Sequence, residues 1–331
     1  MKPSQLQRLL ATAFRHKLKV LIKGAPGIGK TEIVMQACLA AGAALVVMHP
    51  AVSDPTDFKG LPAIVGQHAE FLPYGQLRKL IEATSLTVCF IDDIGQAPHA
   101  VQAALMQLIQ QREIDGMRIS DHVVFCGATN DNSHMAGVQS ILEPVKSRWH
   151  TIVELLPDQI EWVRWAKREG LAEEVLAFVM FRGMEALSNF KATRELTNSP
   201  SPRTVTAAAQ LFAAGLHSHN ILSGACGEGW AAEFLGFVKV YRSLPDPDDC
   251  IRNPRTARVP TTDDASTLYA IAVAVSLRAT TANFAGVTEY LKRLPKEHEV
   301  FAVRDALARE ADLQDTTAFS TWASANVKEL T

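Results

Sequence analysis

The sequence predicts an α/β protein with a parallel sheet in its first half and a mostly helical second half. Two observations predict this class. Up to about residue 155, short apolar runs typical of buried strands alternate with segments of helical spacing, the pattern of a parallel sheet covered on both faces. After Pro157 the strand patterns fade, and stretches rich in Ala, Leu and Glu with helical spacing dominate.

The first strand, expected over residues 19–23, runs into a segment with the spacing G-x-x-x-x-G-K-T. Glycine admits backbone angles closed to other residues, so successive N–H groups can surround a phosphate, and the following helix points its positive end there. The lysine of such a loop reaches the β- and γ-phosphates, and the next hydroxyl ligates Mg²⁺. A glycine-rich turn without a ligand is the alternative. The expected ATP and Mg²⁺ site consists of Gly24, Ala25, Pro26, Gly27, Ile28, Gly29, Lys30 and Thr31.

The remaining elements follow in order. The first half is expected to hold helices over residues 4–16, over 31–41 and from Pro98 onward, and further strands over 44–48, 86–91, 122–128 and 151–155. The second half is expected to hold helices over residues 158–169, 171–187, 202–216, 228–243, 265–279, 281–293 and 297–310, with breaks at 198–202 and 245–260. We therefore predict three domains: an α/β nucleotide-binding core over 1–155, a helical lid over 156–222 and a helical C-terminal extension over 223–331.

Composition narrows the class. The 331 residues are 47% hydrophobic and 21% charged, which is typical of a globular chain. The net charge of −2 gives no support for broad electrostatic binding to nucleic acid or to an anionic membrane. Five scattered cysteines without C-x-x-C spacing favour a reducing compartment. The longest apolar run, residues 37–48, is too short to span a bilayer, so we expect a soluble, cytoplasmic protein.

Polar side chains follow two of the expected strands. Asp92 and Asp93 come directly after residues 86–91, and Asn130 ends the next strand. Ligands of open α/β sheets bind at these strand ends, so Asp92 is expected to hold Mg²⁺ and Asp93 to polarise the attacking water. Asn130 is expected to orient water or contact the γ-phosphate. A helix N-cap or a turn for the acidic pair and an Asx-turn for the asparagine are the alternatives.

These motifs resemble AAA+ ATPases, most closely the MoxR branch of the helix-2-insert clade. The phosphate loop resembles Walker A, and four further segments resemble, in order, Walker B, the run after it, sensor 1 and sensor 2: Cys89–Asp93, Gly95–Arg112, Gly127–Asn130 and Ser201–Arg203. The resemblance covers roughly residues 15–216. It implies a P-loop NTPase core with a five-stranded parallel sheet and a helical lid.

The resemblance also assigns roles outside these motifs. It places a β-hairpin insert over Asp57–Gly75, with its tip at Ile64–His68 facing a central pore, and a second hairpin over Arg112–Ile119. Arg148, followed by a tryptophan, resembles an arginine finger that reaches the γ-phosphate bound by a neighbouring subunit. A surface salt bridge is the alternative for this arginine.

Arg203 has support of its own. Ser201 is a good N-cap and Pro202 a good first helical residue, which places Arg203 near the positive end of a helix. A cation there is unfavourable unless an anion lies nearby, and a bound phosphate would supply that anion. By gripping the γ-phosphate, Arg203 would couple hydrolysis to movement of the lid.

Asp93 departs from the family pattern, because most members carry Glu at this position. The shorter side chain withdraws the carboxylate from the water. Two hypotheses follow: slow hydrolysis with a switch-like ATP state, or a shifted strand that restores the reach. Replication-initiator and helicase-loader AAA+ proteins also carry Asp-Asp here.

The resemblance implies a chaperone-like ATPase that forms a homo-oligomeric ring, expected to be hexameric. It would remodel, assemble or activate a partner, with a von Willebrand factor A-domain protein as the candidate. A DNA-directed loader or motor is the first rival, disfavoured by the charge and by the lack of a recognisable DNA-binding module. A nucleotide-dependent scaffold with negligible hydrolysis is the second.

Overall fold

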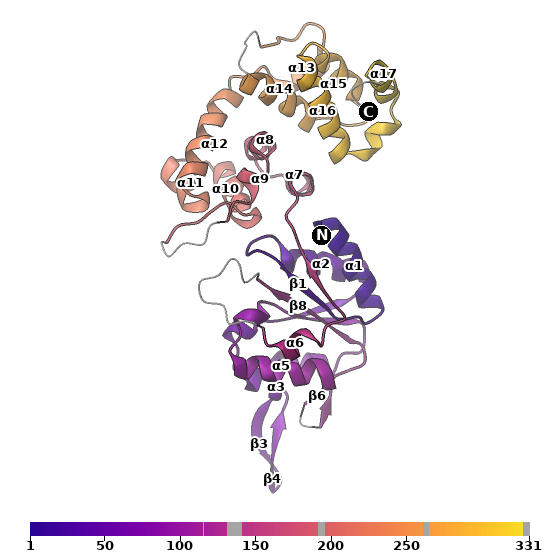
Figure 1. Cartoon of the computed structure of the whole chain (residues 1–331), viewed down its shortest axis with the longest axis vertical. Helices are drawn as coiled ribbons and strands as arrows, with labels where there is room; N and C mark the ends of the chain where they lie inside the picture. Colours follow the sequence, from indigo (N-terminus) through magenta and orange to yellow (C-terminus); the bar gives the residue numbers. More distant parts are fainter. Residues whose placement is uncertain (115, 131–140, 191–195, 261–264, 327–331) are drawn as a thin grey trace. The chain divides into compact units, whose positions relative to one another are not determined.

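The computed structural model describes residues 1–114, 116–130, 141–190, 196–260 and 265–326 (Figure 1). The chain forms two compact units. The first is built from Met1–Pro157, and the second begins at Asp158 and contains the helices that follow. The predicted boundary between a lid and an extension near residue 222 stays a prediction.

The first unit contains the expected five-stranded parallel sheet. Its strands lie in the order β2-β5-β8-β1-β9, and every neighbouring pair is parallel. The predicted strands are confirmed to within about a residue at each end. Their bounds are β1 (Val20–Lys23), β2 (Ala44–Met48), β5 (Thr87–Ile91), β8 (Val123–Thr129) and β9 (Thr151–Glu154).

Helices cover both faces of this sheet, as the apolar strands predict. Alternate residues of β5 show it: Val88 and Phe90 join one buried cluster, and Cys89 and Ile91 join another. The first cluster includes side chains of α1 (Pro3–Arg15) and α2 (Lys30–Ala41), and Figure 1 shows these helices on one side of the sheet. The second cluster includes side chains of α3 (Thr56–Lys59), α4 (Gly75–Ile81) and α5 (His99–Gln111).

Both predicted hairpins are confirmed. Strands β3 (Leu61–Val65) and β4 (His68–Leu72) pair antiparallel, and so do β6 (Glu113–Ile114) and β7 (Met117–Arg118). The β3–β4 hairpin projects from the first unit (Figure 1), and Ile64 at its tip is 84% exposed. That the tip faces a pore stays a prediction.

The second unit is helical among its described residues, as predicted. The helices over His219–Cys226 and Thr317–Ala325 were not predicted. Two other differences from the sequence-based prediction have local causes. The helix expected over 171–187 is broken at Gly183, whose φ of +70° no helix accepts. The expected break at 245–260 contains a short helix, because Asp246 caps the backbone N–H of Asp248 and Pro247 takes the first helical position. The helices are α7 (Gln159–Arg168), α8 (Glu173–Arg182), α9 (Met184–Leu187), α10 (Pro202–Ala213), α11 (His219–Cys226), α12 (Glu228–Tyr241), α13 (Pro247–Arg252), α14 (Ala265–Leu277), α15 (Phe284–Leu291), α16 (Lys296–Arg309) and α17 (Thr317–Ala325).

Helix α14 joins the two hydrophobic cores of this unit. Ala270 and Val273 belong to the core formed with α7–α12, whereas Ile271 and Val275 belong to the core formed with α13–α17. A helix that is apolar on every side is buried, as α14 is here. No helix among the described residues is long and apolar enough to cross a membrane.

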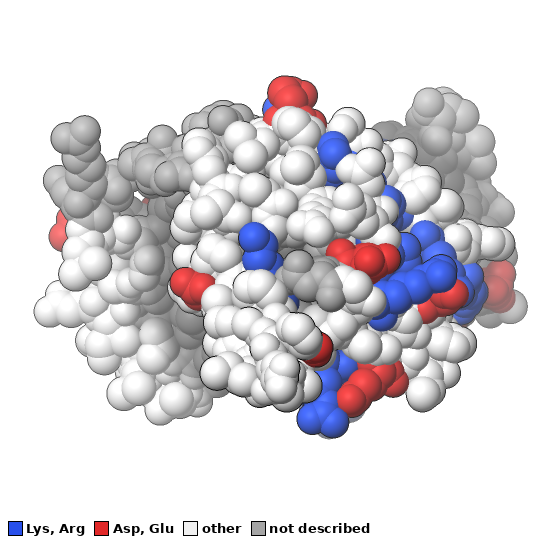
Figure 2. Space-filling model, turned by 90° about the horizontal axis from the view of Figure 1, so that it is seen from below, with Lys and Arg blue, Asp and Glu red and all other residues white. Residues whose placement is uncertain are grey.

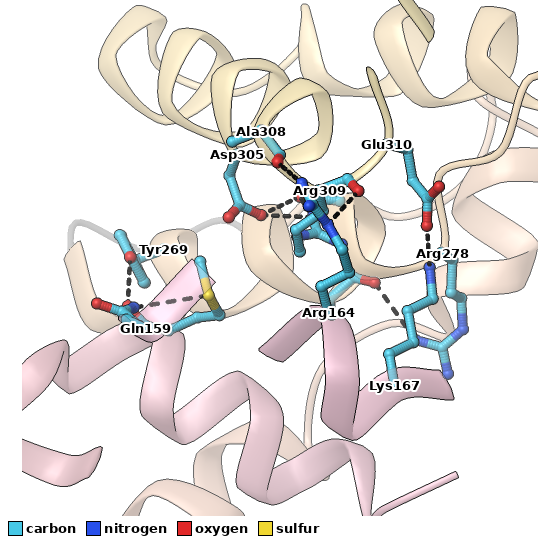
Figure 3. Close-up of polar contacts among 12 residues, drawn as sticks. Gln159, Arg164, Lys167, Tyr269, Arg278, Asp305, Ala308, Arg309 and Glu310 are labelled. Atoms are coloured by element: carbon cyan, nitrogen blue, oxygen red, sulfur yellow. Dashed lines mark hydrogen bonds and ion pairs between the residues drawn. The ribbon is translucent and has the colours of Figure 1, made fainter. Parts of the chain in front are cut away.

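A buried polar network also ties α7, α14 and α16 together (Figure 3). Asp305 accepts hydrogen bonds from Ser276 Oγ and Arg309 Nη2, each at 2.5 Å, and Arg309 is only 3% exposed. From α7, Arg164 donates to the carbonyl oxygens of Arg309, at 2.8 Å, and of Ala308, the last residues of α16. These carbonyls have no partner within the helix, so Arg164 satisfies groups that burial would otherwise leave unpaired.

We expect Arg309→Met to destabilise the second unit by about 3–5 kcal/mol, because it leaves the Asp305 charge buried without its partner. Urea unfolding followed by circular dichroism measures the loss. Arg304→Met on the exposed face of α16 is the matched control and should change stability by less than about 0.5 kcal/mol. The double change Asp305→Leu with Arg309→Met should recover much of the loss. Equal stability of Arg309→Met and the control would contradict a structural role for the pair.

Candidate nucleotide-binding site

The phosphate loop connects β1 to α2, and its glycines are required by its shape. Gly27 and Gly29 have φ values of +74° and +94°, in the left-handed region that favours glycine. A Cβ added to Gly24 would lie 2.5 Å from Ile28 Cδ1 and 3.0 Å from the carbonyl oxygen of Leu155. The loop therefore has its expected place between strand and helix, and α2 begins at its end.

Lys30 is held inside this loop. Lys30 is only 7% exposed, and its Nζ donates to the carbonyl oxygens of Gly24 and Ala25, both at 3.0 Å. It also donates to Asn130 Oδ1 at 2.8 Å. A buried ammonium needs such acceptors, and a phosphate oxygen is an acceptor of the same kind.

The acidic pair joins the same network. Thr31 Oγ1 donates to Asp92 Oδ2 at 2.9 Å, and the backbone N–H of Asp93 donates to Asp92 Oδ1 at 3.1 Å. Asn130 Nδ2 donates to Asp93 Oδ1 at 3.2 Å. One continuous set of hydrogen bonds thus runs from Lys30 through Asn130 to Asp93. The sequence places these residues at strand ends but does not reveal that Asn130 contacts both partners.

Sheet register explains why these groups meet. Gly127 of β8 lies beside Leu21 of β1 and beside Ile91 of β5, so the C-terminal ends of the three strands lie next to one another. Asp93 has φ +53° and ψ +40°, a left-handed conformation that Asp tolerates better than most residues and that often marks a functional site.

The donor set suits Mg²⁺. Thr31 and Asp92 offer two hard oxygen ligands in hydrogen-bond contact, and Mg²⁺ is usually bound by one or two protein oxygens together with water and phosphate. Among the described residues there is no cluster of three or more His, Cys, Asp or Glu that would suit a dedicated metal cage.

Arg148 lies at the N-terminal ends of the strands, whereas the phosphate loop lies at their C-terminal ends. It follows α6 (Glu143–Lys146) and precedes β9, which is parallel to β1. Its guanidinium donates to the Pro144 carbonyl and, at 3.3 Å, to Ser147 Oγ, while its buried Nε has no partner among the described residues. The next residue, Trp149, is 7% exposed and anchors this segment in the core.

Arg203 belongs to the second unit, so its predicted contact with the γ-phosphate stays a prediction. The helix that carries it has the expected cap: Ser201 Oγ accepts from the backbone N–H of Thr204 at 3.2 Å, and Pro202 opens α10. Arg203 is exposed in the first turn of that helix.

A parallel five-stranded sheet with this loop and acidic pair defines a P-loop ATPase of the AAA+ class. Residues 19–149 match the family model of the AAA domain (dynein-related subfamily). No curated protein sequence matches the chain. Residues 19–149 thus form an AAA domain, the nucleotide-binding domain of AAA+ ATPases, a class that binds nucleotide with Mg²⁺ and typically assembles into rings.

Solved structures also resemble this chain. The Holliday junction branch migration motor RuvB of Thermotoga maritima is 16% identical, with 88% of this chain and 86% of that chain covered and a TM-score of 0.43. NtrX from Brucella abortus, in complex with ADP, is 14% identical, with 98% of this chain and 67% of that chain covered and a TM-score of 0.43. Both TM-scores lie below 0.5, so neither likeness bears on function.

We expect Gly24→Ala to lower the ATPase rate about fivefold, because the new methyl group would lie 3.0 Å from the Leu155 carbonyl oxygen and shift the loop by a few tenths of an ångström. Steady-state phosphate release measures the rate, and titration with a fluorescent ATP analogue measures affinity. Gly224→Ala in α11 is the matched control, since a Cβ there meets nothing within 4 Å. A Gly24→Ala protein as active as this control would refute the proposed loop geometry.

Proposed function

We propose that this chain is a MoxR-like, chaperone-like AAA+ ATPase. It hydrolyses Mg-ATP at the interfaces between subunits of a hexameric ring and uses the cycle to remodel, assemble or activate a partner protein. The observation that carries the proposal is the single hydrogen-bond network that unites Lys30, Thr31, Asp92, Asp93 and Asn130.

Each group of this network has a role in hydrolysis. Lys30 binds the β- and γ-phosphates in place of the acceptors it now holds. Asp93 accepts a proton from the attacking water. The water oxygen bonds to the γ-phosphorus, and the bond between the γ-phosphorus and the ADP oxygen breaks. Asn130, which holds the Asp93 carboxylate at 3.2 Å, orients the carboxylate and the water. Mg²⁺, held by Thr31 and Asp92, would supply positive charge to the phosphates.

The place of Arg148 supports a site shared between subunits. Strand β1 separates Arg148 from the phosphate loop of the same chain, a span of about 13 Å or more at 3.3 Å per residue. A guanidinium at that edge reaches a phosphate only if a second copy presents its own loop there. Arg148 would then stabilise the charge that develops on the transferred phosphoryl group.

Two further features support the MoxR branch and a protein partner. The β3–β4 hairpin lies where the helix-2 insert is expected, and it exposes Ile64 and Phe71. We assign its tip to the pore of the ring and Arg203 to the movable lid. A von Willebrand factor A-domain protein is the partner we propose.

A DNA-directed loader or motor is the second candidate, favoured by the Asp-Asp pair. The surface gives it little support. Figure 2 shows a cluster of Lys and Arg toward the right of the face that it presents, with Asp and Glu beside it, and most of this face is uncharged. Several surface cations are paired with acids, as in Arg78–Glu82 at 2.7 Å and Arg118–Asp121 at 3.1 Å.

Asp93→Glu tests whether the short side chain of Asp93 limits the rate of hydrolysis. We expect ATP turnover to rise about tenfold, because the longer side chain brings the carboxylate nearer to the water. Asp93→Asn is the control: it should bind ATP with little change and hydrolyse it at least about 100-fold more slowly. Turnover of Asp93→Glu at or below the level of the wild type would show that the short side chain does not limit the rate.

Capture of partners by the Asp93→Asn protein, held in its ATP state, tests the proposed function directly. We expect it to retain a von Willebrand factor A-domain protein in the presence of Mg-ATP. The Lys30→Ala protein, which cannot hold the phosphates, is the control and should retain less of it. Binding of DNA that weakens steeply with salt would instead support the loader or motor.

A further inference from the structure

We propose that Lys19 is a second cationic residue of the half-site that each subunit presents to its neighbour, where it binds phosphate oxygens of the neighbour's nucleotide beside Arg148. This inference rests on the proposed ring.

Lys19 lies at the N-terminal ends of the strands, as Arg148 does. It directly precedes β1, and its backbone N–H donates to His150 Nδ1 at 3.0 Å. The backbone N–H of His150 donates in return to the Lys19 carbonyl at 2.9 Å. Because Arg148 lies two residues before His150, both cations lie where β1 and β9 begin, and the phosphate loop lies at the other end of β1.

Arg112 is a third cation near Lys19 and Arg148. Arg112 donates to the carbonyl oxygens of Ser120 and Val123, at 2.7 and 3.0 Å, so its guanidinium is fixed to the start of β8. Partial burial lowers the pKa of Lys19, and the positive charges of Arg112 and Arg148 lower this pKa further. Like charges gathered at one edge cost free energy, and a bound anion would remove that cost.

Two of the three cations have donors to spare. The only hydrogen bond of the Lys19 ammonium within the described residues is a long one, 3.4 Å, to the Ile109 carbonyl, although an ammonium carries three donors. Both hydrogen bonds that the Arg148 guanidinium makes within those residues come from Nη1, which leaves the donors of Nη2 for an anion. Arg112 uses its guanidinium on the main chain and serves as support. Lys19 and Arg148 together therefore suit an anion with several oxygens and more than one charge, such as a polyphosphate.

Lys19→Met tests this role, because it removes the charge and keeps most of the aliphatic chain. We expect the KM for ATP to rise about tenfold, the loss of one charged hydrogen bond, with a smaller change in kcat. Lys17→Met is the matched control: it makes the same charge change two residues away on an exposed side chain and should leave KM unchanged. Lys19→Arg should keep most of the affinity. Should Lys19→Met fail to fold, as a thermal melt would show, Lys19→Gln takes its place.

Mixed rings decide whether Lys19 acts on the neighbour. A Lys19→Met subunit retains its own phosphate loop, and a Lys30→Ala subunit retains its cationic edge, so mixing them should create intact sites and restore a low KM. The same mixture with Arg148→Ala in place of Lys19→Met tests the finger. Restoration by Arg148→Ala but not by Lys19→Met would overturn the role of Lys19 and leave the shared site standing. Restoration by neither variant would overturn both the role of Lys19 and the shared site. A KM for Lys19→Met equal to that of Lys17→Met would overturn the role of Lys19 alone.

Discussion

The hydrogen bond from Lys30 Nζ to Asn130 Oδ1, 2.8 Å long, is the contact on which the nucleotide site depends. It joins the loop after β1 to the end of β8, and the same amide holds the Asp93 carboxylate. A γ-phosphate that binds Lys30 competes with Asn130 for the ammonium protons. In the proposed site, occupancy of the loop would thereby be coupled to the freedom of Asn130, and through it to the carboxylate that would activate water.

The sequence allowed much of this site to be predicted, because its geometry follows from one rule. Asp92, Asp93 and Asn130 each follow an apolar run, and parallel strands bring such positions to a common edge. What it did not predict depends on side-chain direction and tertiary packing. That Asn130 contacts Lys30 and Asp93 at once, or that Asp93 adopts a left-handed backbone, has no trace in residue spacing.

The helical half shows the same limit. Helices with a clear apolar face, such as α7 and α10, were expected to within a few residues. In contrast, α13 is short and begins with Asp246 and Pro247, residues that mark a turn as well as they mark a helix start. The cap explains where this helix starts, and the burial of Cys250 and Ile251 in the core of α14–α17 stabilises it further, but no local pattern reports that burial.

Strand β1 gives the two proposed half-sites a physical connection. Its C-terminal end leads into the loop that holds the phosphates, and its N-terminal residue is preceded by Lys19, hydrogen bonded to the segment that carries Arg148. A buried strand of four residues paired on both sides cannot stretch or bend freely, so a shift at one end is passed to the other. In the proposed ring, this strand would be the direct physical link between the nucleotide state of one loop and the cations offered to the neighbouring loop.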